Sequence, residues 1–159
     1  MGGQIRQVAY IGLGSNLGDR QANIERALAL LQSHGLELVA VAPYLETEPY
    51  GVTDQPSFIN TVCCVKTVLE PLQLLDLLLQ LELDMGRVRL RHWGERNIDL
   101  DLLLYEEQVL DLPRLKLPHP DLHNRSFVLE PLVELAPSLV HPVLGRTMGQ
   151  LLEALRAKA

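Results

Sequence analysis

Residues 97–104, NIDLDLLL, constrain the fold most, because polar and apolar side chains alternate strictly at the start of this segment. Successive side chains of a β-strand point to opposite faces of a sheet. Asp99 and Asp101 therefore fall on one face, whereas Leu100 and Leu102 fall on the other. The pattern predicts a strand in a sheet with one buried face and one face open to water.

Five segments before this strand also carry periodic patterns. In the order strand, helix, strand, strand, helix they are residues 8–13, 24–31, 36–44, 58–68 and 71–85. Gly35 and Gly86 suit the two helix ends, and residues 46–56 form a predicted loop. With strand 97–104 the order becomes βαββαβ, which predicts an α+β fold with a ferredoxin-like antiparallel sheet and helices packed on it.

The remaining segments are predicted to add to this core. Residues 107–112 are expected to pair with strand 97–104 as a hairpin, and residues 113–124 to form a loop. Short helical patterns at 127–135 and 148–155 predict C-terminal helical additions. No repeat or linker interrupts the chain, so residues 1–159 are expected to form a single domain.

Composition excludes several classes of protein. With 14 basic and 20 acidic residues the formal charge is -6, which argues against the broad basic surface of nucleic-acid binders. The two cysteines, Cys63 and Cys64, are adjacent and cannot link distant segments. No apolar run is long enough for a membrane span, and we expect a cytoplasmic protein without a membrane partner.

The acidic pair in strand 97–104 is the main candidate for chemistry. Side chains two apart on a strand stand roughly 6–7 Å from each other, so Asp99 and Asp101 could hold one or two hard cations. The pair follows a stretch with four arginines, Arg87, Arg89, Arg91 and Arg96. Aspartates on a merely solvated strand are the alternative, but carboxylates beside guanidinium groups suit a nucleotide-phosphate site.

The glycines of Gly12-Leu13-Gly14 suggest a dinucleotide-binding motif, but Leu17 replaces the third glycine of that motif. No phosphate-binding lysine of the P-loop type follows either. We therefore expect a structural turn at Gly12-Leu13-Gly14.

Five stretches of the sequence resemble the 6-hydroxymethyl-7,8-dihydropterin pyrophosphokinases of folate biosynthesis. They are YIGLGSNLGD at 10–19, ETEPYGVTDQPSFIN at 46–60, LELDMGRVR at 81–89, HWGERNIDLDLLLY at 92–105 and LPHPDLHNRSFVLEPL at 117–132. The resemblance implies transfer of the β,γ-pyrophosphoryl group of MgATP to the hydroxymethyl group of the pterin, with release of AMP.

The resemblance also implies roles for individual residues. Asp99 and Asp101 match ligands of two Mg²⁺ ions and, with Arg87 and Arg96, form the implied catalytic group. The implied ATP-binding residues are Glu82, Arg89, Arg91, Trp93, His119 and Arg125. The implied pterin-binding residues are Thr47, Gly51, Val52, Phe58, Asn60 and Phe127. Small-molecule substrates and a monomeric enzyme are expected.

Some positions depart from the family pattern and leave alternatives open. His92, Val52 and Pro120 replace residues that are common in the family, and either Arg89 or Arg91 could be the phosphate-contacting loop arginine. An RNA-binding module on a βαββαβ sheet is one rival, opposed by the acidic charge. A metal-dependent phosphohydrolase that uses the same carboxylates is another, which only the pterin-matching positions oppose.

Overall fold

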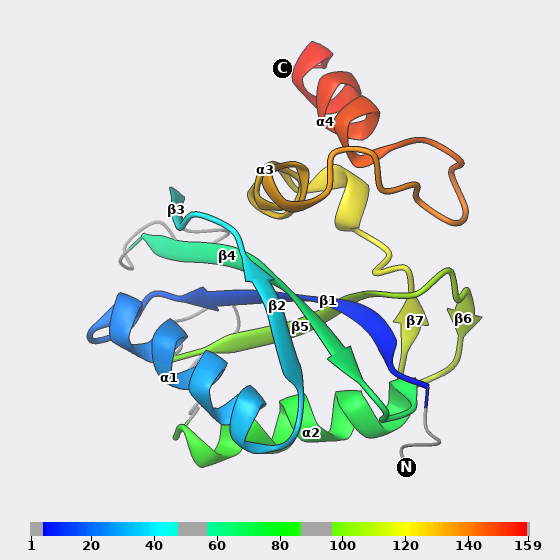
Figure 1. The fold of residues 1–159 in the computed structure, drawn as a ribbon. Coiled ribbons are helices and arrows are strands. Elements are labelled where there is room, and N and C mark those ends of the chain that lie inside the picture. The colour runs from blue at the N-terminus through cyan, green and yellow to red at the C-terminus, as the bar shows by residue number, and fades with distance from the viewer. Residues whose placement is uncertain (1–4, 48–56, 87–96, 159) are drawn as a thin grey trace.

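The protein combines helices with one antiparallel five-stranded sheet, as the α+β prediction requires (Figure 1). The computed structural model describes residues 5–47, 57–86 and 97–158. The sheet strands are β1 (Gln7–Ser15), β2 (Glu37–Val41), β3 (Leu45–Thr47), β4 (Phe58–Thr67) and β5 (Asp99–Tyr105). Their order is β2-β4-β1-β5, and the short β3 pairs with β4. The central strand β1 is thus antiparallel to a neighbour on each side.

Helices cover both faces of this sheet. They are α1 (Arg20–Ser33), α2 (Pro71–Asp84), α3 (Ser126–Leu135) and α4 (Met148–Ala157), with a short 3-10 turn at Leu122–Asn124. Figure 1 shows α1 and α2 below the sheet and α3 and α4 above it. None of the helices in the described ranges has the length and apolar character needed to cross a membrane.

Two hydrophobic cores follow from this layering. The core on the α1 and α2 side takes alternate residues of β1, Ala9, Ile11 and Leu13, together with Leu100 and Leu102 of β5. The second core lies under α3 and α4 and includes Val62, Leu103, Leu129, Leu132 and Met148. The alternation predicted for residues 97–104 therefore does place its leucines against helices.

The ends of the first two helices agree with the sequence signals. The Asp19 carboxylate accepts a hydrogen bond from the Ala22 amide at 3.0 Å and caps the start of α1. Pro71 occupies the first turn of α2. Gly35 and Gly86 follow the two helices with φ values of +91° and +76°, a conformation that side chains with a Cβ rarely adopt.

Three predictions of local structure are wrong. Residues 107–112 do not pair with β5, because a turn at Glu106 (φ 48°) turns the chain away and β6 (Leu110–Asp111) pairs with β7 (Lys116–Leu117). The predicted loop 113–124 therefore contains a strand and the 3-10 turn. The predicted loop 46–56 begins inside β3, and its remaining residues, 48–56, lie outside the described ranges.

A buried histidine between α3 and α4 in the chain makes stability depend on pH. His141 is 4% exposed, and its Nδ1 accepts hydrogen bonds from the Val143 and Leu144 amides at 3.2 and 3.0 Å. Burial lowers the pKa of His141 below its ordinary value, and the neighbouring His123 lowers it further. The unfolded chain therefore binds a proton near pH 6.5 that the folded chain takes up only at lower pH.

We expect the free energy of unfolding to fall as the pH decreases from about 7 through this window, because the unfolded state then binds more protons. Urea unfolding at several pH values would measure the slope. His141→Asn keeps a side-chain oxygen for the two amides but cannot titrate, so its slope should be smaller. The exposed His34→Asn variant leaves His141 in place and should retain the parent's slope; equal slopes for all three proteins would contradict the expectation.

Candidate active site

The strand register brings the predicted site residues into rows across one face of the sheet. Gly14 of β1 pairs with Asn60 of β4 on one side and with Asp99 of β5 on the other. Gly12 pairs in the same way with Asp101. Residues that pair directly across antiparallel strands share a face, so Asn60 and Asp99 flank a glycine, roughly 10 Å apart at the backbone. The glycines leave the space between them free of side chains.

The two glycines differ in how closely other residues approach them. A Cβ at Gly14 would lie 2.6 Å from Asn60 Oδ1 and 3.6 Å from Phe58, so only glycine fits there without displacing Asn60. A Cβ at Gly12 would meet Leu103 at 3.5 Å, an ordinary contact. Both glycines lie inside β1, so the expected structural turn at Gly12-Leu13-Gly14 is wrong.

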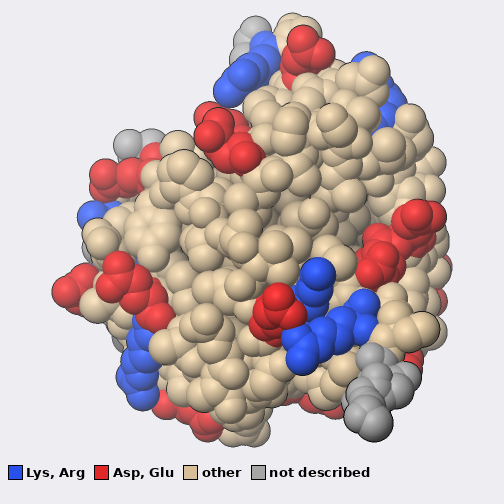
Figure 2. All heavy atoms as spheres, in the orientation of Figure 1, with Lys and Arg blue, Asp and Glu red and all other residues tan. Residues whose placement is uncertain are grey.

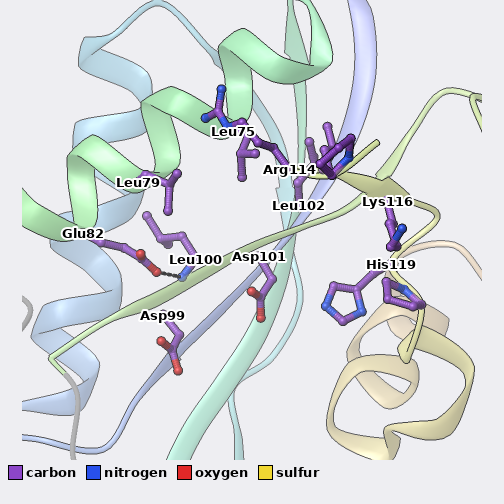
Figure 3. A pocket seen from close by; sticks show the side chains of 13 residues that line it. Leu75, Leu79, Glu82, Asp99, Leu100, Asp101, Leu102, Arg114, Lys116 and His119 are labelled. Carbon is purple, nitrogen blue, oxygen red and sulfur yellow. Dashed lines mark hydrogen bonds between the residues drawn. The ribbon is translucent and has the colours of Figure 1, made fainter. Parts of the chain in front are cut away.

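Asp99 and Asp101 stand two residues apart on β5 and point to the same side (Figure 3). Asp99 is half-buried and Asp101 is exposed. No group of three or more His, Cys, Asp or Glu residues within the described ranges forms a metal site. Two carboxylates alone still suit Mg²⁺, which keeps several water ligands and takes the rest from one or two carboxylates and phosphate oxygens.

Glu82 of α2 fixes the strand segment between the two aspartates. Its side chain is buried, and its Oε2 accepts a hydrogen bond from the Leu100 amide at 2.8 Å (Figure 3). β5 is the last strand of the sheet order, so a side chain supplies the acceptor that a further strand would otherwise provide. Glu82 thereby sets the position of the backbone that carries both aspartates.

A pocket of about 420 Å³ runs along β5, between α2 and the segment that leads to α3 (Figure 3). Its polar side contains Glu82, Asp99, Asp101 and His119. Its apolar lining comes from Leu75, Leu79, Leu100, Leu102, Pro113, Leu115 and Pro120, and Arg114 and Lys116 complete it. The pocket therefore offers an apolar surface beside a carboxylate pair.

His119 faces the aspartates from the opposite wall of the pocket (Figure 3). Its backbone amide donates to the Leu103 carbonyl at 2.9 Å, and its Nδ1 accepts from the Asp121 amide at 3.2 Å. Burial lowers the pKa of His119; Asp101 opposes this shift, and Arg125 adds to it. The ring is therefore neutral near pH 7, with Nδ1 occupied and Nε2 carrying the proton.

Arg125 and Phe127 lie next to each other at the start of α3. The Arg125 guanidinium stands 5.7 Å from the centroid of the Phe127 ring and 3.4 Å from an oxygen of Asp121. α3 packs against β4 and β3, so this pair lies on the side of the sheet that carries Asn60. On that side the Asn60 side-chain amide donates to Thr47 Oγ1 at 2.7 Å.

Comparison with known proteins shows which family has this arrangement. The family model described as 7,8-dihydro-6-hydroxymethylpterin-pyrophosphokinase (HPPK) matches residues 10–137. The chain belongs to the HPPK family. This HPPK-family chain is 49% identical over 149 residues to the 2-amino-4-hydroxy-6-hydroxymethyldihydropteridine pyrophosphokinase of Pseudomonas aeruginosa, covering 93% of this chain and 91% of that protein. The protein of the same name from Haemophilus influenzae is 47% identical over 135 residues, 84% of each chain.

A solved structure of an HPPK-containing protein has the same fold. The Plasmodium falciparum HPPK-DHPS structure with pteroate superposes with a TM-score of 0.79 at 16% sequence identity. The superposition covers 99% of this chain but only 44% of that chain. The likeness therefore concerns the fold, and the HPPK-family chain spans less than half of that longer protein.

Nine of the residues that the HPPK resemblance marks lie within the described ranges. They are Thr47, Phe58, Asn60, Glu82, Asp99, Asp101, His119, Arg125 and Phe127. Seven others lie outside the described residues: Gly51, Val52, Arg87, Arg89, Arg91, Trp93 and Arg96.

Sequence reasoning missed several pocket residues. Leu75 and Leu79 were assigned only to a leucine-rich helix, and Arg114 and Lys116 to a loop. Arg114 forms an ion pair with Asp76, and Lys116 forms one with Asp111. The alternation of charged and apolar residues along 114–117 was a signal for a strand, but it did not indicate which face meets β5.

The Glu82 contact can be tested by its effect on stability. Glu82→Leu leaves the Leu100 amide without this acceptor, and we expect it to lower the free energy of unfolding by about 1–3 kcal/mol. Glu82→Gln retains a side-chain oxygen that can accept the same bond and should lose less. Urea unfolding of the three proteins at one pH would measure the differences. A Leu variant as stable as the parent would mean that the contact does not hold β5 in place.

Proposed function

We propose that this chain transfers the β,γ-pyrophosphoryl group of ATP to 6-hydroxymethyl-7,8-dihydropterin, a step of folate biosynthesis. The hydroxymethyl oxygen attacks the β-phosphorus of ATP and loses its proton. The bond between the β-phosphorus and the oxygen that bridges to the α-phosphorus breaks, and AMP leaves with that oxygen. The observation that most supports this proposal is that the carboxylate pair and the Asn60 amide flank glycines on one face of the sheet, in a chain of the HPPK family.

The pocket along β5 is the proposed ATP site. Its volume of about 420 Å³ lies in the range of small-molecule sites. The leucines of α2 and β5 offer apolar surface for the flat base, and the aspartates mark the end for the polyphosphate. ATP bound in this direction extends its phosphates from the edge of the sheet toward Gly14 and Asn60.

Asp99 and Asp101 are the proposed ligands of two Mg²⁺ ions. Bound magnesium would neutralise phosphate charge and fix the geometry of the transferred group. The protein's own part is to hold the two carboxylates at a fixed spacing on a paired strand, which the Glu82 contact with Leu100 stabilises. Positioning of this kind supplies much of the rate in phosphoryl transfer.

Cationic and neutral donors are proposed to complete the ATP site. His119 presents a neutral N–H opposite Asp101, and Arg125 lies near it at the start of α3. Arg87 and Arg96 are proposed to stabilise the charge that develops as the bond to AMP breaks. Arg89 or Arg91, Trp93 and Glu82 are proposed as further ATP contacts.

The pterin is proposed to bind on the other side of Gly14. A flat heterocycle with polar edges needs apolar faces above and below and a few fixed polar groups at its rim. Phe58 and Phe127 are half-buried and available as such faces, and Asn60 supplies the polar group held by Thr47. Gly51 and Val52 are proposed to add backbone contacts.

Several broader properties belong to the same proposal. We assign residues 1–159 to one pyrophosphokinase domain, and the order β2-β4-β1-β5 with two helices on one face supports a ferredoxin-like core. A monomeric enzyme belongs to the same proposal. A cytoplasmic location is supported by the ATP requirement and two free cysteines. The charge of -6 and the mixed charges on the face in Figure 2 argue against nucleic acid.

Asp99→Ala tests the reaction and the metal ligands together. With ATP, Mg²⁺ and the pterin, the parent should form AMP only when pterin is present. The variant should remain folded and lose at least about 100-fold in turnover, in line with the roughly 2.7–4 kcal/mol that one preorganised charge contact supplies. Asp84→Ala removes an exposed carboxylate at the end of α2 and should retain activity. Formation of ADP, or hydrolysis without pterin, would show that the substrate assignment is wrong.

Gly14→Ala tests the proposed pterin side. The new methyl group would displace Asn60 Oδ1, so we expect KM for the pterin to rise at least tenfold (about 1.4 kcal/mol) while KM for ATP changes little. Gly12→Ala adds the same methyl group two residues away in ordinary contact with Leu103 and should stay near the parent values. Steady-state kinetics with each substrate varied would decide; equal effects of the two substitutions would contradict the assignment.

A further inference from the structure

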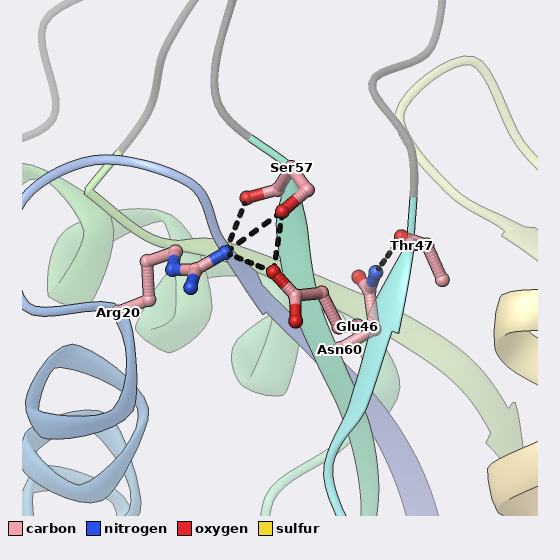
Figure 4. A network of polar contacts seen from close by, with 5 residues as sticks. All are labelled: Arg20, Glu46, Thr47, Ser57 and Asn60. Carbon is pink, nitrogen blue, oxygen red and sulfur yellow. Dashed lines mark hydrogen bonds and ion pairs between the residues drawn. The ribbon is translucent and has the colours of Figure 1, made fainter.

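We propose that Arg20 is a positioning residue for pterin binding. It holds the two-stranded ribbon of β3 and β4 in place from the face opposite the proposed pterin site. This inference rests on the proposed function. Arg20 is the first residue of α1 and lies outside every segment assigned to substrate so far. Its guanidinium reaches Glu46 in the middle of β3 and Ser57, the residue before β4; these are the two strands that carry Thr47 and Asn60 (Figure 4).

One nitrogen of Arg20 makes all of these contacts. Its Nη1 donates to the Ser57 carbonyl oxygen at 2.9 Å and to the Ser57 hydroxyl at 3.0 Å, and it lies 3.1 Å from Glu46 Oε2. The Ser57 hydroxyl in turn donates to the same Glu46 oxygen at 2.6 Å. We call this set of three residues, Arg20, Glu46 and Ser57, the Arg20 clasp.

The clasp and the proposed ligand contacts lie on opposite faces of the ribbon. Glu46 pairs with Ile59, whereas Thr47 pairs with Phe58. Because side chains alternate along a strand, Glu46 and Ser57 point to the face of α1, and Thr47 and Asn60 point to the face of α3. Figure 4 shows this arrangement, with the Arg20 contacts on one side of the strands and the Asn60–Thr47 hydrogen bond on the other.

The ribbon needs such an anchor because β3 is short. β3 has three residues and, within the described part of the chain, pairs with β4 alone. A strand of this length has few backbone hydrogen bonds to hold its position. The clasp connects both strands of the ribbon to α1, which itself packs into the main core through Ile24, Ala27 and Leu31. The position of Thr47, and with it the orientation of the Asn60 amide, thereby becomes linked to the core.

Helix stability does not explain an arginine at this position. A cation in the first turn of a helix opposes the helix dipole, and apart from the Asp19 cap no acidic residue stands at the start of α1. Glu46 supplies a further carboxylate, from β3, that contacts the guanidinium itself. The Ser57 hydroxyl, followed by Arg20, lowers the pKa of Glu46, so its carboxylate is charged at neutral pH. The contact is also exposed, with 62% of the Glu46 side chain accessible, and exposed ion pairs add little to stability.

Arg20→Ala should therefore change substrate binding more than folding. We expect KM for the pterin to rise about five- to twenty-fold, KM for ATP to change less than about twofold, and the thermal midpoint to change little. Arg20→Lys should recover most of the loss, because a single nitrogen makes all three contacts and an ammonium group has three donors. Arg26→Ala removes the same charge from an exposed position on α1 and is the matched control.

A second measurement reports on the position of the β3–β4 ribbon and does not require catalysis. The side-chain amide resonances of Asn60 in ¹⁵N–¹H spectra report its hydrogen bond to Thr47, and they should shift in Arg20→Ala but not in Arg26→Ala. If the parent forms no AMP with pterin but these shifts occur, the proposed function fails while the positioning role stands. Unchanged Asn60 resonances, equal effects on both KM values, or an Arg20→Ala variant that behaves like Arg26→Ala would each overturn the proposal.

Discussion

The central strand β1 pairs with β4 and β5 along most of its length, and the relative positions of Asn60, Asp99 and Asp101 depend on this double pairing. Its register aligns Gly14 with Asn60 and Asp99, so residues 39 positions apart in the chain flank one glycine. Any slip by one residue would turn the aspartates toward the helices. Burial of Ile11 and Leu13 against α1 and α2 holds the register, because these residues alternate with the two glycines.

The face of β1 that carries the glycines has two different environments. Toward one end, Val62 and Leu103 are covered by α3 and α4 and form the second core. Toward the other end, Gly14, Asn60 and Asp99 carry polar or no side chains, and Phe58 lies close to Gly14 on the same face. The C-terminal helices thus stabilise half of the face and leave the other half accessible. The chain can keep a polar site on a central strand because the apolar residues of the second core, next to the site, supply the stabilising burial that the polar residues do not.

The sequence predicts the parts of this design that depend on local periodicity. The alternation in 97–104, the glycines that end α1 and α2 and the two C-terminal helices were all predicted, and the structure has them. Pairing between distant segments is not local, so the partner of residues 110–111 was wrong. Gly14 looks like a turn residue because it precedes Ser15 and Asn16, yet β1 continues beyond the predicted end at residue 13 and includes both Gly14 and Ser15. Glu82 was identified as a site residue by the family resemblance alone. Its role as a hydrogen-bond acceptor depends on β5 being the edge strand, which the local sequence does not indicate.

Charge balance gives a physical reason for the proposed dependence on magnesium. ATP carries several negative charges into a pocket that already holds Asp99 and Asp101, in a chain of net charge -6. Among the described residues near the pocket, Arg114, Lys116 and Arg125 are each paired with an aspartate, and His119 is neutral. These cations therefore bring little net positive charge. Divalent ions bound to the aspartates would make the local charge positive. The aspartate pair, which repels free ATP, would then favour ATP in its complex with magnesium.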